Sequence, residues 1–490
     1  MPVSVQDVVH RLEPALSGEV GGTKKSVHLF SIDGVNLAYD GASGALHRLS
    51  SVGRDTLEWA ISHPGLVGQE TPADLIRDLS SYPPEDVREA WDEVRYLYGK
   101  TIFAPDLTME SATGDDDDRG ALEAGLKAMC LDVAHDCNLA CSYCFASTGN
   151  FGGRPHLMTK EAGRDAIDFL IAGSRDRKYL DVDFFGGEPL MSFDVVKEVV
   201  RYAREEGRER GKEFRFTLTT NCTLLNEKKI GFLNDEGISL ILSIDGRPHV
   251  HDAQRRFRDG RPSHALAIEK ARQVAISRGG KDYYIRGTYT KANLDFDADV
   301  RYLYEQGFRR LSLEPAVGDP DDGSSISESD LPALRESYLR IVKFWHECAQ
   351  AGDPFEFYHF NLGLSGGLCR ERRITGCGAG YEYVAVTPTG EVYPCHQLVG
   401  KQEFLLGDTK SGMVRSGIME AFHAARIPQK PVCRACWARY LCGGGCHARA
   451  IAAGNPLTEP DPLSCHIMRT RLEFALYAQT LPVSRKENIT

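Results

Sequence analysis

The sequence C-N-L-A-C-S-Y-C-F, residues 137–145, contains three cysteines at the spacing C-x3-C-x2-C, namely Cys137, Cys141 and Cys144. Three thiolates at this spacing can hold three corners of a [4Fe-4S] cube and leave the fourth iron without a protein ligand. An iron that is open in this way is a place where a substrate or a cofactor binds. Zinc is the alternative, but a structural zinc site needs four ligands and this loop supplies three.

The composition is that of a large globular protein. A chain of 490 residues is too long for one ordinary domain, so two or three domains are expected. No apolar run is long enough to span a bilayer, and the N-terminus lacks the pattern of a secretory signal, so we expect a cytoplasmic protein without a membrane partner. The net charge of -11 argues against nucleic acid as a partner, because phosphate binding needs a basic surface.

The chain has 14 cysteines, and their short spacings argue for cluster or metal ligation. Disulfides are a poorer account, because the cytosol keeps thiols reduced. Cys130, Cys222 and Cys348 belong to no motif. We expect them to be buried and to behave as small hydrophobic side chains.

Residues 1–110 are predicted to form a first domain. Short strand patterns run from about residue 26 to 50, and helical patterns follow at 52–61 and 84–97. A three-stranded ribbon with such helices suits a winged-helix-like peptide-recognition domain, in which an extended leader peptide adds to an edge strand. A plain structural cap is the alternative. An acidic, solvated linker is expected at 111–124.

Residues 125–330 alternate between strand and helix patterns. Strands are expected at 127–134, 181–185, 214–220, 239–245, 283–290 and 309–315, and amphipathic helices at 160–172, 193–206, 226–236 and 264–277. Six such repeats predict an α/β fold, with a parallel sheet curled into a partial (β/α)6 TIM-like barrel. Sites in such barrels lie at the carboxyl ends of the strands. Beyond the barrel we expect connecting helices at 331–368, a cysteine-rich domain at 369–470 and a C-terminal tail at 471–490.

Polar residues and glycines follow several of these strands. Two glycines in G-G-E-P, residues 186–189, let the backbone approach a ligand closely, and polar strand ends offer hydrogen bonds. A strand-to-helix turn that binds no ligand would also favour Gly-Gly. Arg286, in a later strand, is a candidate for pairing with a carboxylate group of a ligand, and a surface salt bridge is the alternative.

The residues around the first motif, H-D-C-N-L-A-C-S-Y-C-F-A-S-T-G-N-F-G-G (135–153), resemble the radical S-adenosylmethionine (SAM) enzymes. They are more specifically similar to thioether-forming peptide maturases, namely the six-cysteine-peptide (SCIFF) maturases and the quinohemoprotein amine dehydrogenase maturation protein. The resemblance implies a [4Fe-4S] cluster on the three cysteines, whose open iron binds SAM and whose reduction releases a 5′-deoxyadenosyl radical.

The same resemblance assigns the SAM contacts. G-G-E-P would bind the amino group, Arg286 the carboxylate, the polar strand ends the ribose, and the aromatic residues of the loop the adenine. The expected SAM-contacting residues are Tyr143, Phe145, Gly186, Gly187, Glu188, Pro189, Thr219, Thr220, Asn221, Ser243, Asp245 and Arg286. Aromatic packing within the loop is an equal possibility for Tyr143 and Phe145.

Seven further cysteines follow at C-x12-G-x4-C, C-x2-C-x5-C-x3-C and a final C. This order is similar to the SPASM pattern, which implies a C-terminal SPASM domain with two auxiliary [4Fe-4S] clusters. The implied ligands are Cys377, Cys395 and Cys446 for cluster I, and Cys433, Cys436, Cys442 and Cys465 for cluster II. Cys369 is an open question as a fourth ligand of cluster I. Two zinc-ribbon sites would fit the same spacing.

The resemblance covers roughly residues 25–470 and implies a cytoplasmic radical SAM/SPASM enzyme. Its expected reaction is an intramolecular thioether crosslink, from a cysteine sulfur to a carbon, in a cysteine-containing precursor peptide or small protein subunit. A flavodoxin- or ferredoxin-type protein would donate the electron. The alternatives are an enzyme that forms carbon-carbon crosslinks or oxidises a protein side chain, and a non-catalytic iron-sulfur electron-transfer or peptide-binding protein.

Overall fold

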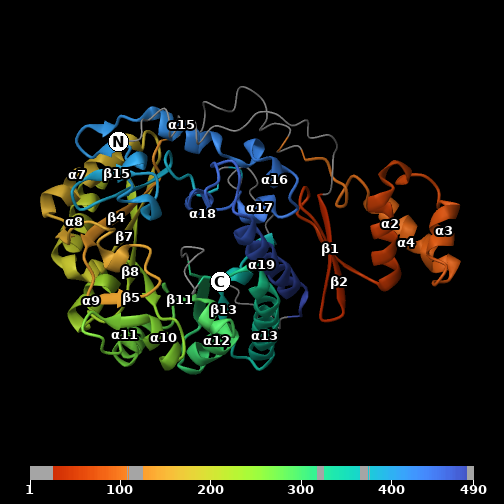
Figure 1. The fold of residues 1–490 in the computed structure, drawn as a ribbon, viewed down its shortest axis with the longest axis horizontal. Helices are drawn as coiled ribbons and strands as arrows, with labels where there is room; N and C mark the ends of the chain where they lie inside the picture. Colours follow the sequence, from red (N-terminus) through yellow and green to blue (C-terminus); the bar gives the residue numbers. More distant parts are fainter. Residues whose placement is uncertain are drawn as a thin grey trace.

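The computed structural model describes residues 26–106, 109, 125–316, 325–364, 374 and 376–482. Its first part is an antiparallel sheet of β1 (Val27–Ile32), β2 (Val35–Asp40) and β3 (Leu46–Leu49), in that order. Helices α2 (Ser51–Ser62), α3 (Ala73–Asp78) and α4 (Pro84–Leu97) follow. The strands, α2 and α4 match the expected elements, whereas α3 was not predicted. Figure 1 shows the helices at the right-hand end of the molecule. The expected linker at 111–124 and Cys369 lie outside the described residues.

The two faces of this first sheet are buried against different partners. Ala38 and Val27 pack among α2 and α4. Phe30 and Tyr39 instead belong to the main hydrophobic core of the protein. Because side chains alternate between the faces of a strand, the same two strands can serve both cores. The first domain is therefore packed onto the rest of the chain through one face of its sheet.

The central feature is a parallel sheet whose strands follow each other in sequence order. They are β4 (Ala128–His135), β7 (Tyr179–Gly186), β8 (Glu213–Thr220), β9 (Ser239–Ser243), β11 (Tyr283–Tyr289) and β12 (Arg310–Pro315). The intervening helices are α7 (Lys160–Gly173), α8 (Phe193–Arg210), α9 (Glu227–Asp235), α10 (Pro248–Gln254), α11 (His264–Ser277) and α12 (Phe296–Glu305). Figure 1 shows these helices on the outer side of the curved sheet. The β/α alternation expected from the sequence is present.

The sheet extends further than the sequence patterns predict. On one side, β13 (Glu356–Phe357) pairs in parallel with β12, so the segment expected to be connecting helices contains α13 (Leu331–Gln350) and then a strand. On the other side, β14 (Tyr383–Val386) pairs in parallel with β4. An unpaired strand edge exposes backbone donors and acceptors, and these short strands cover it.

The cysteine-rich segment is thus joined to the main sheet by backbone hydrogen bonds. After β14 the chain forms the antiparallel strands β15 (Glu391–Tyr393), β16 (Gly407–Asp408) and β17 (Gly412–Met413). Short helices follow at α15 (Ser416–Ala424), α16 (Pro431–Arg434), α17 (Arg439–Cys442) and α18 (His447–Ala452). No signal marked residues 383–386 as a strand of the main sheet, because four residues are too few for a periodic pattern.

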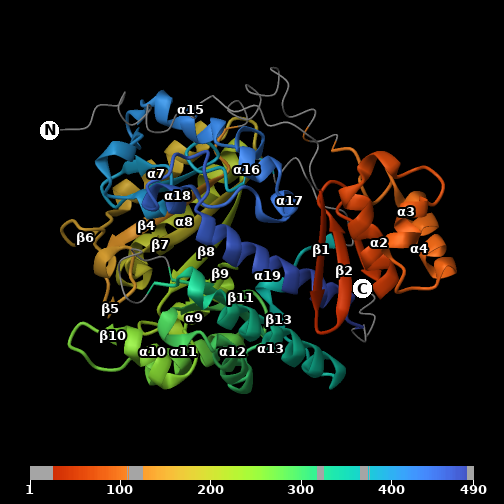
Figure 2. The ribbon, with the colours of Figure 1, turned by 45° about the vertical axis from the view of Figure 1, so that its right-hand side comes forward.

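Residues 471–480, expected as the start of a tail, belong to the long helix α19 (Pro462–Thr480). The side chain of Asp461 caps its first turn, with Oδ2 accepting a hydrogen bond from the Ser464 N–H at 3.2 Å. Phe474 and Leu476 are buried, which anchors the last turns. Figure 2 shows α19 running from the cysteine-rich region to β1.

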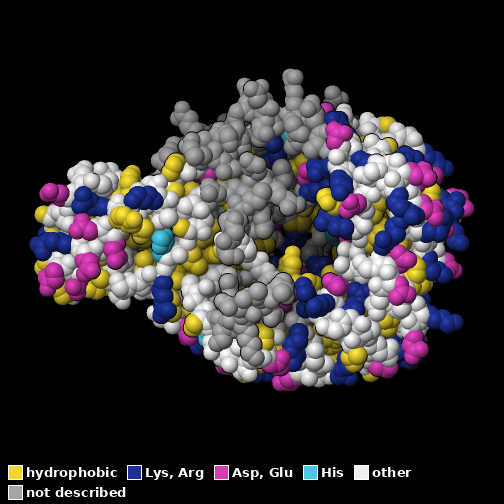
Figure 3. Space-filling model, turned by 180° about the vertical axis from the view of Figure 1, so that it is seen from behind, with side chains coloured by type: hydrophobic (Ala, Val, Ile, Leu, Met, Phe, Trp, Pro, Cys, Tyr) yellow, Lys and Arg dark blue, Asp and Glu magenta, His cyan; other side chains and the backbone are white. Residues whose placement is uncertain are grey.

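None of the helices in the described ranges combines the length and the apolarity that a bilayer crossing needs. On the face drawn in Figure 3, Lys and Arg side chains are interspersed with Asp and Glu, and the surface is hollowed near its centre.

Candidate functional site

The three cysteines of the first motif border one cavity at the carboxyl ends of the parallel strands. Cys137, Cys141 and Cys144 all line this space, which has a volume of about 210 Å³. Burial raises the pKa of Cys137 to about 12, and Glu188 and the other two thiols add to the rise. The amide Nδ2 of Asn221 lies 3.7 Å from Sγ of Cys137. Within the described part of the chain, no three His, Cys, Asp or Glu side chains are arranged to hold a metal ion.

A strand pairing that sequence reasoning missed holds the cluster loop, residues 137–145. β5 (Leu139–Cys141) pairs antiparallel with β10 (Arg255–Phe257), which places Cys141 opposite Arg255. Arg258 forms an ion pair with Asp136 at the start of the same loop. The sequence R-R-F is too short and too charged to indicate a strand, so only the fold reveals this pairing.

Glu188 of the G-G-E-P turn is fully buried and is not among the residues that line the cavity. Its carboxylate oxygens accept hydrogen bonds from the Thr220 hydroxyl at 2.8 Å, from the Asn221 N–H at 2.8 Å and from the Leu190 N–H at 3.0 Å. Burial raises the pKa of Glu188, although these hydrogen bonds oppose the rise. The side chain therefore ties the end of β8 to the turn after β7, and it is a positioning residue.

The two glycines before Glu188 are required by packing. A Cβ at Gly187 would lie 2.1 Å from the carbonyl oxygen of Asp136, and a Cβ at Gly186 would lie 2.3 Å from that of Ala134. Neither distance is tolerated by any side chain. Both glycines also line the cavity, so the turn lies against the cluster loop and the cavity at once.

Asp245 is a second buried carboxylate that holds the cluster loop. Its oxygens accept from the Tyr143 hydroxyl at 2.6 Å, from Nε of Arg255 at 3.0 Å and from the Thr288 N–H at 2.9 Å. Burial raises the pKa of Tyr143, which keeps the hydroxyl protonated as a donor. The side chain of Asp245 is fully buried, and its role as a ribose contact stays a prediction.

We expect Tyr143→Phe to lower the free energy of unfolding by about 1–3 kcal/mol, because it leaves a buried carboxylate without one of its donors. Urea unfolding of the apo-protein measures this change. Tyr179→Phe is the matched control, because Tyr179 is 52% exposed; it should change the stability by about 0.5 kcal/mol or less. If Tyr143→Phe behaved like this control, the hydrogen bond to Asp245 would have no structural role.

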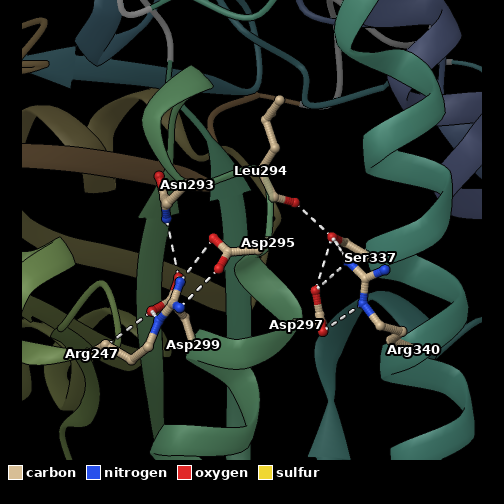
Figure 4. A network of polar contacts seen from close by, with 8 residues as sticks. All are labelled: Arg247, Asn293, Leu294, Asp295, Asp297, Asp299, Ser337 and Arg340. Atoms are coloured by element: carbon tan, nitrogen blue, oxygen red, sulfur yellow. Dashed lines mark hydrogen bonds and ion pairs between the residues drawn. The ribbon is translucent and has the colours of Figure 1, made fainter.

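The chain after Asp245 is anchored by an ion-pair network. Nε of Arg247 lies 2.8 Å from Oδ1 of the buried Asp299, and its two terminal nitrogens lie 2.8 and 2.9 Å from Asp295. Figure 4 shows Arg247 between the two carboxylates, with Asn293 also reaching Asp299. Asp297 and Arg340 form a neighbouring pair that joins α12 to α13. The loop that carries Asp245 is thereby fixed to α12.

Most of the expected SAM contacts do line the cavity. They are Tyr143, Phe145, Gly186, Gly187, Thr219, Thr220, Asn221, Ser243 and Arg286. Glu188, Pro189 and Asp245 are not among the lining residues. Some lining residues had no signal in the sequence, because their positions depend on strand ends and loops from distant parts of the chain; they include Arg255, Thr288, Glu314, His396 and Gln397.

The wall formed by β12 carries a fixed negative charge. Oε2 of Glu314 lies 2.6 Å from Arg471 of α19, and Oε1 lies 2.9 Å from Nε2 of His359. Burial alone would raise the pKa of Glu314, but Arg471 and His359 outweigh it and hold the pKa far below its usual range. Burial and the charge of Arg471 lower the pKa of His359 to about 4. At neutral pH the carboxylate is therefore ionised and the imidazole is neutral.

The later cysteines fall into two spatial sets. In set I (Cys377, Cys395 and Cys446), burial raises the pKa of Cys395, and the thiols of Cys446 and Cys377 add to the rise. In set II (Cys433, Cys436, Cys442 and Cys465), burial raises the pKa of Cys433 to about 12; Lys430 opposes this rise, and the other three thiols add to it. These are the same groups that the resemblance to the SPASM pattern implies, and their ligation stays a prediction.

Set I lies next to the cavity of the cluster loop. His396 and Gln397, which directly follow Cys395, line that cavity. The His396 ring lies 5.6 Å from the ring of Phe145 and 5.1 Å from that of Phe185. Burial lowers the pKa of His396 to about 4, and Arg286 adds to the effect. A neutral imidazole therefore separates Cys395 from the first cysteine motif.

Comparison with known proteins shows a similarity between the central sheet and one superfamily. Residues 132–290 match the family model described as the Radical SAM superfamily. The match contains the cluster loop, the G-G-E-P turn and the strands from β7 to β11. The similarity to this superfamily therefore covers the part of the chain that contains the first cysteine motif.

Individual relatives match over longer stretches. Mycofactocin maturase MftC of Mycolicibacterium smegmatis is 28% identical over 351 residues, which are 69% of this chain and 83% of that protein. An uncharacterised protein of Methanocaldococcus jannaschii, MJ0907, is 28% identical over 192 residues, 39% of this chain and 63% of that protein. The chain thus spans less than two thirds of the length of the latter relative.

The solved structures of Streptococcus suis SuiB share the fold. With S-adenosylmethionine bound, SuiB matches at a TM-score of 0.52 and 16% identity, over 90% of this chain and 99% of that one. With its precursor peptide SuiA bound, it matches at a TM-score of 0.51 and 16% identity, over 88% and 96%.

Proposed function

We propose that this chain is a radical SAM peptide maturase that forms thioether crosslinks in a cysteine-containing precursor peptide or small protein subunit. One observation carries the proposal: the three thiols of the cluster loop line the same cavity as His396 and Gln397, the residues after Cys395. A site that generates a radical and a site that binds a substrate thiol would therefore adjoin each other.

Cys137, Cys141 and Cys144 would hold a [4Fe-4S] cluster, which with SAM bound supplies a 5′-deoxyadenosyl radical. A single zinc ion would need tetrahedral thiolates roughly 3.8 Å apart, from a Zn–S distance of about 2.3 Å. A cube with iron at its corners spreads its thiolates more widely.

For SAM itself, we propose contacts from the residues that face the cavity. Thr219, Asn221 and Ser243 would offer hydrogen bonds to the ribose and amino groups, and Arg286 would pair with the carboxylate through its planar fork. Glu188 and Asp245 would act indirectly. Each would hold in place a backbone segment that carries residues in contact with SAM.

The two later cysteine sets would hold auxiliary [4Fe-4S] clusters in a SPASM domain, set I with cluster I and set II with cluster II. Cys369 is proposed as the fourth ligand of cluster I when no substrate is bound. A coordinated thiol loses its proton, so an open iron in cluster I would activate the substrate cysteine.

The proposed reaction forms one sulfur-carbon bond and breaks one C–H and one S–H bond. The hydrogen atom goes to the adenosyl group of SAM, the thiol proton to solvent, and the surplus electron to the auxiliary clusters. The starting electron would come from a flavodoxin- or ferredoxin-type donor in the cytoplasm. The buried wall around Cys137 would keep water from the radical.

The N-terminal domain is proposed to recognise the precursor peptide by adding an extended segment to the edge of the sheet. The fold shared with SuiB, solved with its precursor peptide, supports a peptide substrate. A second candidate function is carbon-carbon crosslinking or side-chain oxidation by the same radical. The similarity to mycofactocin maturase MftC supports a maturase of either kind.

The test uses the reconstituted protein with SAM, dithionite and the cysteine-containing peptide encoded beside its gene. We expect 5′-deoxyadenosine, a peptide lighter by two hydrogens for each crosslink, and one fewer iodoacetamide-reactive thiol for each crosslink. A peptide that loses two hydrogens but keeps all its thiols would replace the proposal with the second candidate. A protein that forms no 5′-deoxyadenosine would contradict both.

A further inference from the structure

A lysine is buried between the two later cysteine sets. Lys430, which precedes α16, is 2% exposed, and its Nζ donates a hydrogen bond to the Gly444 carbonyl oxygen at 2.9 Å. A buried ammonium group is costly unless nearby negative charge or several acceptors compensate it. Among the described residues, the Gly444 carbonyl oxygen is little compensation by itself for a cation at this depth.

The surroundings of Lys430 are rich in sulfur. Burial lowers the pKa of Lys430, while four thiols raise it: Cys433 and Cys442 of set II, and Cys377 and Cys446 of set I. Sγ of Cys433 lies 4.0 Å from the same Gly444 carbonyl oxygen that Lys430 contacts. The ammonium group therefore lies within electrostatic range of both sets.

Other cations near these cysteines act on one set each. The positive charge of Lys127 lowers the pKa of Cys377 in set I, against the effect of burial. The positive charge of Arg469 lowers the pKa of Cys465 in set II, against the effect of burial. Lys430 differs from both because it interacts electrostatically with thiols of both sets.

The backbone around Gly444 is shaped to receive this lysine. Gly443, Gly444 and Gly445 have φ values of 79°, 89° and 78°, a region that favours glycine. A Cβ at Gly444 would lie 3.2 Å from Ile427 and 3.8 Å from Nζ of Lys430. The glycine run thus turns the Gly444 carbonyl toward the lysine without a side chain in between.

We propose that Lys430 is a positioning residue whose positive charge raises the reduction potentials of both auxiliary clusters. The inference rests on the proposed function, since it needs the two clusters. A cluster gains negative charge when it accepts an electron, and a buried cation stabilises that reduced form. The electron released by the substrate radical as the sulfur-carbon bond forms then reduces an oxidised auxiliary cluster.

The test is an EPR-monitored redox titration of the reconstituted, full-length protein. Lys430→Met removes the charge and keeps the length of the side chain. We expect both auxiliary clusters to become harder to reduce, by about tenfold in the reduction equilibrium, which is about 59 mV for a one-electron couple. The potential of the SAM cluster should not change. Lys401→Met, the same replacement at an exposed lysine of the same segment, should leave all potentials unchanged.

Lys430→Arg separates charge from shape, because it retains the cation and should keep both potentials near those of the wild type. If Lys430→Met fails to load auxiliary clusters, retained loading and potentials in Lys430→Arg still support the role of the charge. Unchanged potentials in Lys430→Met, or equal shifts in both variants, would overturn the proposal.

The iron content of the wild type separates this failure from that of the proposed function. About twelve iron atoms per chain are expected for three cubes. A content of about four iron atoms per chain would show that the protein has no auxiliary clusters.

Discussion

Replacing Cys137, Cys141 and Cys144 together by alanine will abolish the reductive cleavage of SAM, while the auxiliary clusters remain. The three thiols line the cavity beside the G-G-E-P turn, and the later cysteine sets lie in a different segment with their own thiols. Removing the three ligands therefore removes one cube. Iron per chain should fall by about four, and 5′-deoxyadenosine should no longer form with dithionite.

Cys348→Ala provides the control for this experiment. Cys348 lies in α13 and is 6% exposed, so its loss removes a buried thiol that belongs to no motif. Its iron content and SAM cleavage should equal those of the wild type. An unchanged iron count in the triple variant, or continued formation of 5′-deoxyadenosine, would show that the first motif does not hold the SAM cluster.

Cys377→Ala is expected to eliminate the crosslinked product while leaving SAM cleavage intact. Cys377 is the first residue of set I, and His396 and Gln397, which follow Cys395 of the same set, line the cavity. Without cluster I the substrate thiol would have no iron to bind, although the radical would still form. Peptide mass and the number of reactive thiols report the crosslink. The amount of 5′-deoxyadenosine in the same reaction reports SAM cleavage.

Cys369→Ala tests how cluster I is closed. If the substrate thiol replaces Cys369 at the iron, this variant keeps the iron content and most of the thioether product, and it differs from Cys377→Ala. Loss of cluster I to the same degree in both variants would mean that the protein holds all four corners. The role of the cluster would then be electron acceptance and not thiol activation.

The candidate site was predictable where its residues follow one another closely in the sequence. The spacing of Cys137, Cys141 and Cys144 indicates an open iron-sulfur site because ligands of one cluster on one loop must be near neighbours. The strands that carry Thr219 and Ser243 were also predictable, since each has a local pattern of apolar residues. Their meeting in one cavity follows from the parallel sheet, where all carboxyl ends lie at one edge.

The individual roles of the polar residues were not predictable in this way. Glu188 and Asp245 stand in motifs that suggest ligand contacts, but both carboxylates are buried against protein donors. Arg255 became part of the site because its strand pairs with that of Cys141, which lies 114 residues earlier in the sequence. Sequence spacing contains no information on which partner a polar side chain will choose across such distances.

By itself, the sequence determined the order of most strands and helices, the spacing of the cysteines and the similarity of the central segment to the Radical SAM superfamily. These depend on local periodicity and on short ligand spacings, which any folded form of the chain must respect. Only the tertiary structure decided that α19 brings Arg471 to Glu314, that β14 joins set I to the main sheet, and that Lys430 lies between the two sets. These contacts join distant segments, because the burial of charge and the pairing of strand edges are settled by the whole fold.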